Sequence, residues 1–182
     1  ADRQGITVHV VRENVSDREP KTWVFLLIGA LKGDKTELVV QKATELGVSR
    51  IGVFSSRYCS AYMNENKLER LNRVAREAAK QCLRASVPRV EYYETLEEAL
   101  RAGSECVTRL FACEFLDETE KDLIDTGATV CAVVGSEGGF AEEEYALAQR
   151  LGYCGVSLGK RILRAETAAI ALLSVVMHEA GA

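Results

Sequence analysis

Two short segments of the sequence combine glycine with charged side chains, which is typical of ligand-binding loops. Residues 158–168 (LGKRILRAETA) hold one glycine, three cations, one carboxylate and one hydroxyl, and an apolar stretch follows to Met177. Residues 135–140 (GSEGGF) lie upstream, and their glycines allow positive φ and a close approach of the backbone to a ligand. We expect the two segments to form one pocket.

The residue types in these segments leave several ligands open. Neither segment is a phosphate-binding P-loop, because Arg161 stands where Ser or Thr would have to follow Gly159-Lys160, and neither fits the dinucleotide fingerprint. Backbone groups of residues 158–163 could read an adenine edge, and Arg164 could pair with a carboxylate or phosphate. Equally, Arg164 and Glu166 could be local pairing and capping groups, and residues 135–139 could form a turn without a ligand.

A third group of chemically active residues follows helical spacing. At about 100° per residue, four cations gather on one side of a predicted helix over residues 64–84, and Gln81 lies beside them. Such a surface fits phosphates, and the glutamine could bond a base. A charged helix face is as often merely solvated, so both interpretations remain open. The proposed RNA-binding residues are Arg73, Arg76, Lys80, Gln81 and Arg84.

Composition narrows the class of protein. The chain has 182 residues, 47% of them hydrophobic, and a net charge of -4, so a well-cored domain is expected and any nucleic-acid site must be a local patch. No apolar run is long enough to span a bilayer. The six cysteines and two histidines show no metal-ligand spacing, so no metal is expected. The cysteines are interpreted as free thiols of a reducing cytoplasm.

Strands and helices alternate along the chain. Runs of continuous apolar residues or alternating patterns predict strands at 6–11, 23–28, 51–54, 90–93, 107–115, 129–134 and 156–158. Helical periodicity predicts helices that begin at a capping box of Asp34 and Glu37 and end at Gly47, and at 64–84, 96–102, 142–151 and 164–179. This order predicts an α/β fold with a mainly parallel sheet and flanking helices. Both glycine segments follow strands, at the sheet edge where such folds bind ligands.

Four motifs in order resemble a known family. Residues 42–48 (KATELGV), 77–84 (EAAKQCLR), 134–140 (VGSEGGF) and 158–168 are similar to those of the bacterial 16S ribosomal RNA methyltransferases that methylate N3 of a uridine, within the SPOUT class. The resemblance covers about residues 22–180. It implies an α/β domain with a C-terminal deep trefoil knot, an exception to the rule against threaded chains.

The resemblance also implies a cofactor and its contacts. Family members bind S-adenosyl-L-methionine in the knot loops and form homodimers in which substrate residues approach from the partner subunit. Carried over by position, the cofactor-binding residues are Cys113, Glu114, Val134, Gly135, Glu137, Gly138, Gly139, Leu158, Gly159, Ile162, Leu163, Arg164 and Thr167. Ser136 departs from the family's usual proline and keeps a backbone N–H.

The resemblance implies a reaction and a partner as well. Uridine N3 of 16S ribosomal RNA, free or in the small ribosomal subunit, would attack the sulfonium methyl group. Arg84 would hold the anion or a phosphate, with Glu137 and Glu166 as proton acceptors. Residues 1–20 would be the remnant of an N-terminal PUA-like RNA-binding domain, and 21–182 the methyltransferase domain. The rival hypotheses are a non-catalytic RNA-binding module using the basic helix 68–84, and a generic nucleotide-binding enzyme.

Overall fold

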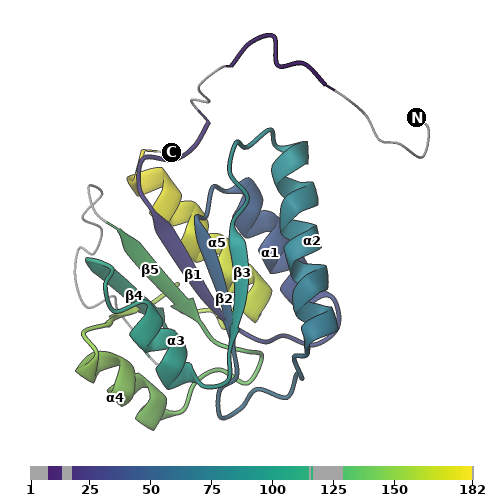
Figure 1. The fold of residues 1–182 in the computed structure, drawn as a ribbon. Coiled ribbons are helices and arrows are strands. Elements are labelled where there is room, and N and C mark those ends of the chain that lie inside the picture. Colours follow the sequence, from purple (N-terminus) through teal and green to yellow (C-terminus); the bar gives the residue numbers. More distant parts are fainter. Residues whose placement is uncertain (1–7, 14–17, 115, 117–128, 182) are drawn as a thin grey trace.

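A six-stranded parallel sheet forms the centre of the molecule (Figure 1). The computed structural model of the chain describes residues 8–13, 18–114, 116 and 129–181. The strands lie in the spatial order β3-β2-β1-β5-β4-β6, and every neighbouring pair is parallel. Their bounds are β1 Val24–Gly29, β2 Arg50–Phe54, β3 Arg89–Tyr93, β4 Thr108–Ala112, β5 Val130–Val134 and β6 Cys154–Val156.

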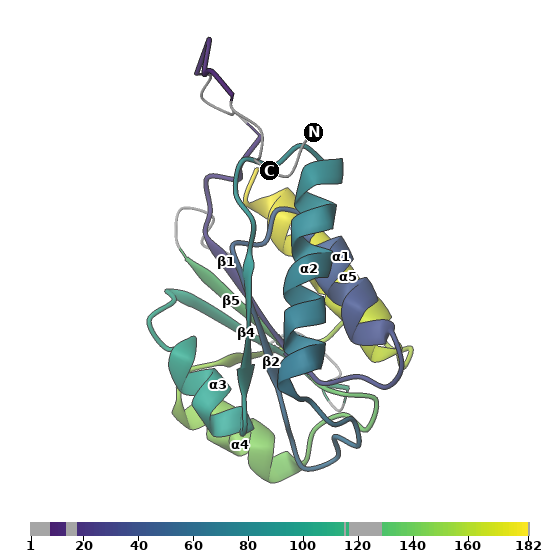
Figure 2. The same cartoon turned by 45° about the vertical axis from the view of Figure 1, so that its right-hand side comes forward.

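Helices cover both faces of this sheet (Figure 2). On one face lie α1 (Lys35–Glu45), α2 (Glu65–Gln81) and α5 (Ala165–Glu179), and on the other lie α3 (Leu96–Ala102) and α4 (Glu142–Arg150). The three-layer arrangement explains why the central strands are apolar at consecutive positions, since each face of the sheet needs a core of its own.

Strand β1 shows how its sequence fills both cores. Val24, Leu26 and Ile28 pack with α1, α2 and α5, while Phe25 and Leu27 pack with α3 and α4. All five side chains are fully buried. Each contributes roughly 1.5–3 kcal/mol relative to an exposed position. The central strands are thereby fixed, and their carboxyl ends form a stable edge from which the loops project.

Most strands and helices agree with the sequence-based predictions, but several details were wrong, among them the last strand, which is Cys154–Val156 instead of 156–158. Residues 8–13 form no strand, because their alternating side chains have no partner strand to pair with. Asp34 makes no side-chain cap bond, and Glu37 instead pairs with Arg70 at 2.9 Å. Strand β4 ends at Ala112, short of the predicted residue 115.

Helix α2 ends earlier than predicted, and this difference changes the position of Arg84. The helix ends at Gln81 instead of residue 84, because Leu83 adopts a left-handed conformation with φ 60°. The amide of Arg84 then donates to the carbonyl of Ala79 at 2.9 Å and that of Leu83 to Lys80, the hydrogen-bond pattern of a Schellman turn. Arg84 is therefore off the helix and off its charged side.

Two predictions are not decided by this architecture. The trefoil knot remains a prediction, because residues 117–128, between β4 and β5, lie outside the described part of the chain. The assignment of residues 1–20 to a separate domain also remains a prediction. Among the helices that the structure describes, none is long and apolar enough to cross a membrane.

Candidate functional site

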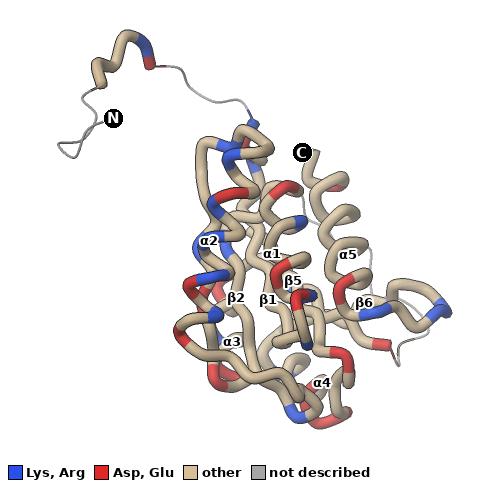
Figure 3. The backbone as a smooth tube through the Cα atoms, turned by 90° about the vertical axis from the view of Figure 1, so that its right-hand side faces the viewer, with Lys and Arg blue, Asp and Glu red and all other residues tan. Residues whose placement is uncertain are grey.

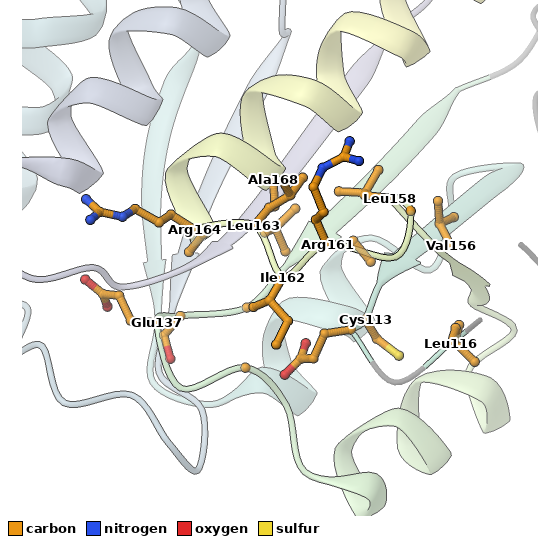
Figure 4. A pocket seen from close by; sticks show the side chains of 18 of the residues that line it. Cys113, Leu116, Glu137, Val156, Leu158, Arg161, Ile162, Leu163, Arg164 and Ala168 are labelled. Carbon is orange, nitrogen blue, oxygen red and sulfur yellow. The ribbon is translucent and has the colours of Figure 1, made fainter. Parts of the chain in front are cut away.

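A cavity of about 660 Å³ lies at the carboxyl ends of β4, β5 and β6 (Figure 4). Its walls come from the segment after β4, the glycine turn after β5 and the loop that joins β6 to α5. The volume lies within the usual range for small-molecule sites, and the position is the one expected for a parallel α/β sheet. The lining residues are Lys35, Ala112, Cys113, Glu114, Leu116, Val134, Gly135, Ser136, Glu137, Gly139, Val156, Leu158, Gly159, Lys160, Arg161, Ile162, Leu163, Arg164, Ala165 and Ala168.

The glycine turn after β5 needs glycine for two physical reasons. Gly139 has φ 66°, and its amide donates to the Ser136 carbonyl at 3.0 Å to close the turn. A Cβ on Gly139 would collide with the Glu114 carboxylate. Gly29 at the end of β1 is equally constrained, since its Cβ would lie 2.5 Å from the Ser136 nitrogen. The backbone of the turn is thus held close to both β1 and the cavity.

The loop between β6 and α5 forms the opposite wall. Gly159 has φ 96°, and the Ile162 side chain is 88% exposed although it is large and apolar. Figure 4 shows Ile162 directed toward the side of the cavity that holds Cys113, while Arg161 and Arg164 extend from the loop in different directions. An exposed aliphatic side chain at a cavity is well suited to cover a flat apolar ring.

Lys35 organises the charge at the cavity. Its ammonium group lies 3.2 Å from Glu137 Oε1 and 3.8 Å from Glu166 Oε1. Glu137 Oε1 also accepts from the backbone N–H of Lys32 at 3.0 Å. Burial opposes ionisation of Glu137, but these hydrogen bonds and the Lys35 charge outweigh it and lower the pKa of the carboxyl. Glu137 therefore ties the glycine turn to the start of α1 as a carboxylate.

Glu166, in the first turn of α5, has a different environment. Its side chain is largely buried, and its Oε2 atom has no hydrogen-bond partner among the described residues. Ser136 Oγ in the glycine turn is likewise buried without a partner there. Buried polar groups are normally paired. Ser136 lines the cavity, and Glu166, which does not, directly follows the lining residue Ala165, so the two unpartnered oxygens are consistent with a site built for a ligand.

The structure brings most of the proposed cofactor residues together. All but Gly138 and Thr167 line the cavity. Gly138 faces Tyr58, and Thr167 is exposed on α5. Nine lining residues were not among the proposed cofactor residues. Five of them lie inside the two segments expected to form the pocket: Ser136, Lys160, Arg161, Ala165 and Ala168. The other four lie outside those segments: Lys35, Ala112, Leu116 and Val156. Lys160 and Arg161 were visible as cations of the segment, whereas Lys35 becomes a site residue only through contacts distant in sequence.

Arg84 does not belong to this cavity, which corrects its predicted role. Its guanidinium donates to the carbonyls of Thr44 and Val48, both at 2.9 Å, and pairs with Glu19 at 2.8 Å. Its side chain is only 5% exposed. These partners lie at the amino-terminal ends of the strands, at the edge opposite the cavity. Arg84 is a structural residue that has no free donor face for an RNA anion.

The basic side of α2 is less basic than its sequence indicates. Arg73, Arg76 and Gln81 are exposed, but Lys80 pairs with Glu77 at 2.7 Å. A second hollow runs between α1 and α2, and acidic and basic residues share its lining: Asp34, Glu37, Leu38, Gln41, Arg70, Arg73, Val74, Glu77, Ala78 and Gln81. Figure 3 shows the two signs of charge interspersed along these helices. Interspersed charges do not form the continuous cationic track that RNA phosphates favour.

The fold and the cavity define a parallel α/β domain with a cavity between two glycine-containing loops. Comparison with known proteins identifies the family: the model of the RNA methyltransferase domain matches residues 18–177, and the chain belongs to this family. A ribosomal RNA small subunit methyltransferase E of Mesomycoplasma hyopneumoniae is 32% identical over 168 residues, 91% of this chain and 74% of that protein.

Solved structures agree with this assignment. The ribosomal RNA small subunit methyltransferase E of Neisseria gonorrhoeae, bound to S-adenosyl methionine, superimposes on this chain with a TM-score of 0.80 at 28% identity. The match covers 91% of this chain and 69% of that one. A methyltransferase of Legionella pneumophila with bound SAM gives a TM-score of 0.82 at 30% identity, with coverage of 88% and 68%. The α/β fold expected for a SPOUT methyltransferase is thereby confirmed.

Proposed function

We propose that the chain is an S-adenosyl-L-methionine-dependent methyltransferase that modifies N3 of a uridine in 16S ribosomal RNA. The observation that carries the proposal is the cavity between the two glycine-containing loops, because two related structures of this fold contain that cofactor. The names of the relatives support ribosomal RNA as the substrate, and the resemblance of the sequence motifs to the family implies uridine N3 as the target.

The residues around the cavity fit this cofactor. Its size suits a nucleoside with a short amino-acid tail. Leu158, Ile162 and Val134 offer apolar surface for an adenine ring, and the unpartnered Ser136 Oγ offers a polar contact beside it. We assign cofactor binding to the eleven of the residues derived from the family motifs that line the cavity. When bound, the cofactor supplies an electrophilic methyl group on a positively charged sulfur.

The chain must also deal with the proton on uridine N3, since N3 is a poor nucleophile while protonated. Of the two proposed acceptors, Glu166 is the better one, because its Oε2 can take a proton without breaking an existing hydrogen bond. Glu137 is less suited, since its lowered pKa and its bonds to Lys32 and Lys35 favour the ionised form. Lys35 and Arg164, at the cavity, replace Arg84 in stabilising a developing uridine anion.

The binding step is tested by calorimetry with S-adenosylhomocysteine. Micromolar affinity that is unchanged by ATP and NAD supports the proposal, whereas competition by those nucleotides would favour a generic nucleotide-binding enzyme.

The reaction is tested by primer extension on small-subunit RNA treated with the protein and cofactor. A new stop at one uridine is expected. RNA binding without any stop would favour a non-catalytic module.

We further propose a homodimer located in the cytoplasm. The α5 helix is apolar on nearly all sides and leaves Val175 52% exposed, which suits an interface between two copies. All six cysteines are free thiols, as in proteins of reducing compartments. Substrate contacts from the partner subunit would complete the site.

A further inference from the structure

Two tyrosines are exposed on a loop that the proposed function has not used, and one of them, Tyr58, packs against the glycine turn of the cavity. The segment of residues 55–64, here called the tyrosine loop, connects β2 to α2 at the carboxyl edge of the sheet. Tyr58 is 48% exposed and Tyr62 is 74% exposed. In Figures 1 and 2 this segment runs along the same edge as the segment between β5 and α4.

The loop is anchored, so the exposure of the tyrosines does not result from a loose chain. Cys59 and Ala61 pack against the core and Met63 is buried, whereas Tyr58, before Cys59, and Tyr62, between Ala61 and Met63, are exposed. Cys59 Sγ donates to the Ala30 carbonyl at 3.2 Å. The Lys67 ammonium donates to the Tyr62 carbonyl at 2.6 Å. Two large aromatic surfaces are therefore held toward solvent by inward-facing neighbours.

Tyr58 and the cavity lie on two sides of the same turn. A Cβ on Gly138 would lie 2.5 Å from Tyr58 Cβ, so the tyrosine packs directly against the glycine turn whose other residues line the cavity. Glu144 strengthens this link, because its carboxylate accepts from the amides of Arg57 and Ala141, both at 2.9 Å. A molecule stacked on Tyr58 is thus next to whatever occupies the cavity.

The charges around the loop favour a nucleic acid. Lys32 and Lys67 lie at the same edge, near the amino-terminal ends of α1 and α2, where helix dipoles add positive potential, whereas Glu137 and Glu166 offset the charge of Lys35 there. Arg57 lies over the Tyr58 ring at 5.8 Å, although its pairing with Glu143 offsets part of its charge. Aromatic rings next to cations are the usual means of binding unpaired bases.

We propose that the tyrosine loop is a stacking surface for unpaired nucleotides of the RNA that flank the target base. Tyr58 and Tyr62 bind base faces, while the cations Lys32 and Lys67 neutralise adjacent phosphates. The strand continues across the glycine turn, so that the target base enters the cavity. This inference rests on the proposed function, to which it adds the residues that position the substrate.

The test compares Tyr58→Leu and Tyr62→Leu with Tyr58→Phe and Tyr62→Phe in the 182-residue chain. Leucine keeps apolar bulk but removes the ring, whereas phenylalanine keeps the ring. Each leucine variant is expected to weaken binding of unmethylated small-subunit RNA by about 5- to 150-fold, with a similar loss at low and high salt because stacking is poorly screened. The phenylalanine variants should bind RNA as the native chain does.

Two measurements keep the result interpretable. Calorimetric affinity for S-adenosylhomocysteine should be unchanged in all four variants, which excludes damage to the cavity. Val107→Ala, at an exposed position before β4 on the opposite edge, serves as the control surface variant. Leucine variants that bind RNA as tightly as the native chain would overturn the stacking surface but leave the methyltransferase proposal intact. Failure of the native chain to bind the cofactor would instead overturn the proposed function.

Discussion

At the residue scale, the two carboxylates near Lys35 have separable roles. Glu137 is tied to Lys32 and Lys35, whereas Glu166 keeps one oxygen without a partner among the described residues. The proposed chemistry needs a group that accepts a proton in the transition state, and such a group contributes about 10²–10⁴-fold to the rate. We therefore propose that Glu166 has that role and that Glu137 has a structural one.

Replacing Glu166 by glutamine should therefore lower kcat by about 10²-fold or more, because glutamine keeps the shape but cannot take the proton. Single-turnover methylation measures the rate, and calorimetry should show cofactor affinity within a few-fold of native. Glu137→Gln is the matched control, and it should reduce the rate far less. If the two variants lose activity equally, or if Glu166→Gln is fully active, Glu166 is not the acceptor.

Gly139 offers a second test at this scale, directed at the cavity instead of the chemistry. Gly139→Ala would place a methyl group against the Glu114 carboxylate and force alanine to φ 66°, so cofactor affinity should fall by at least tenfold. Gly33→Ala has the same backbone cost at φ 63° but no atom within 4 Å of the new methyl group. Calorimetry on both variants separates cavity disruption from backbone strain. Equal affinities would show that the glycine turn does not contact the cofactor.

At the scale of elements, residues 18–20 are fastened to the domain at the edge opposite the cavity. Glu19 accepts hydrogen bonds from Arg84, Ser86 and the Ala85 amide, and Pro20 fills the space beside Gly47. Partial burial opposes ionisation of Glu19, but the bonds from Arg84 and Ser86 outweigh it and lower the pKa of the carboxyl to about 2. The segment before β1 thus enters the sheet in a fixed direction.

The lowered pKa of Glu19 gives this attachment a pH dependence. The unfolded carboxyl titrates near 4.5, so the stabilisation is fully present above that pH and is lost as pH falls toward about 2. Glu19→Gln should lower the free energy of unfolding by about 1–3 kcal/mol at pH 6, and the difference from the native chain should shrink by pH 3. Urea unfolding at several pH values measures this. A difference that stays constant with pH would contradict the assignment.

The sequence was informative for the elements and less so for their ends. Continuous apolar runs predicted β1 and β5, because each must fill two cores at once. The predicted parallel order of the strands also indicated the edge of the sheet at which the cavity lies. The prediction placed Arg84 on the helix because it did not anticipate the left-handed conformation of Leu83. That conformation is disfavoured for a residue with a Cβ, and no local sequence pattern signals it. The carbonyl and carboxylate partners of Arg84 are also distant in sequence.

At the scale of the whole molecule, the site is built from loops that the fold gathers from distant parts of the chain. Lys35 near the start, Glu114 in the middle and Arg164 near the end line one cavity. Such a site is assembled only in the folded state, so a ligand bound there stabilises the entire domain by mass action. A second copy of the chain would stabilise the domain in the same way if it binds to surface that is exposed in one protomer.

The surface that should be buried in this way is the outer side of α5. The helix is apolar at its centre, and in Figure 3 its charged residues are confined to the two ends. We expect the native chain to sediment as a dimer. Val175→Glu should shift it toward monomer, because a carboxylate buried at an interface without a partner is strongly unfavourable.

The control for the dimer is Val107→Glu, which adds the same charge at a position 65% exposed on another element. It should leave the dimer intact. Sedimentation velocity over a range of concentrations measures both variants, and circular dichroism checks that they remain folded. RNA methylation by Val175→Glu should fall in step with the dimer fraction, because the partner subunit is proposed to supply substrate contacts. A folded monomeric variant with native methylation would show that one chain suffices, and an unchanged dimer would place the interface elsewhere.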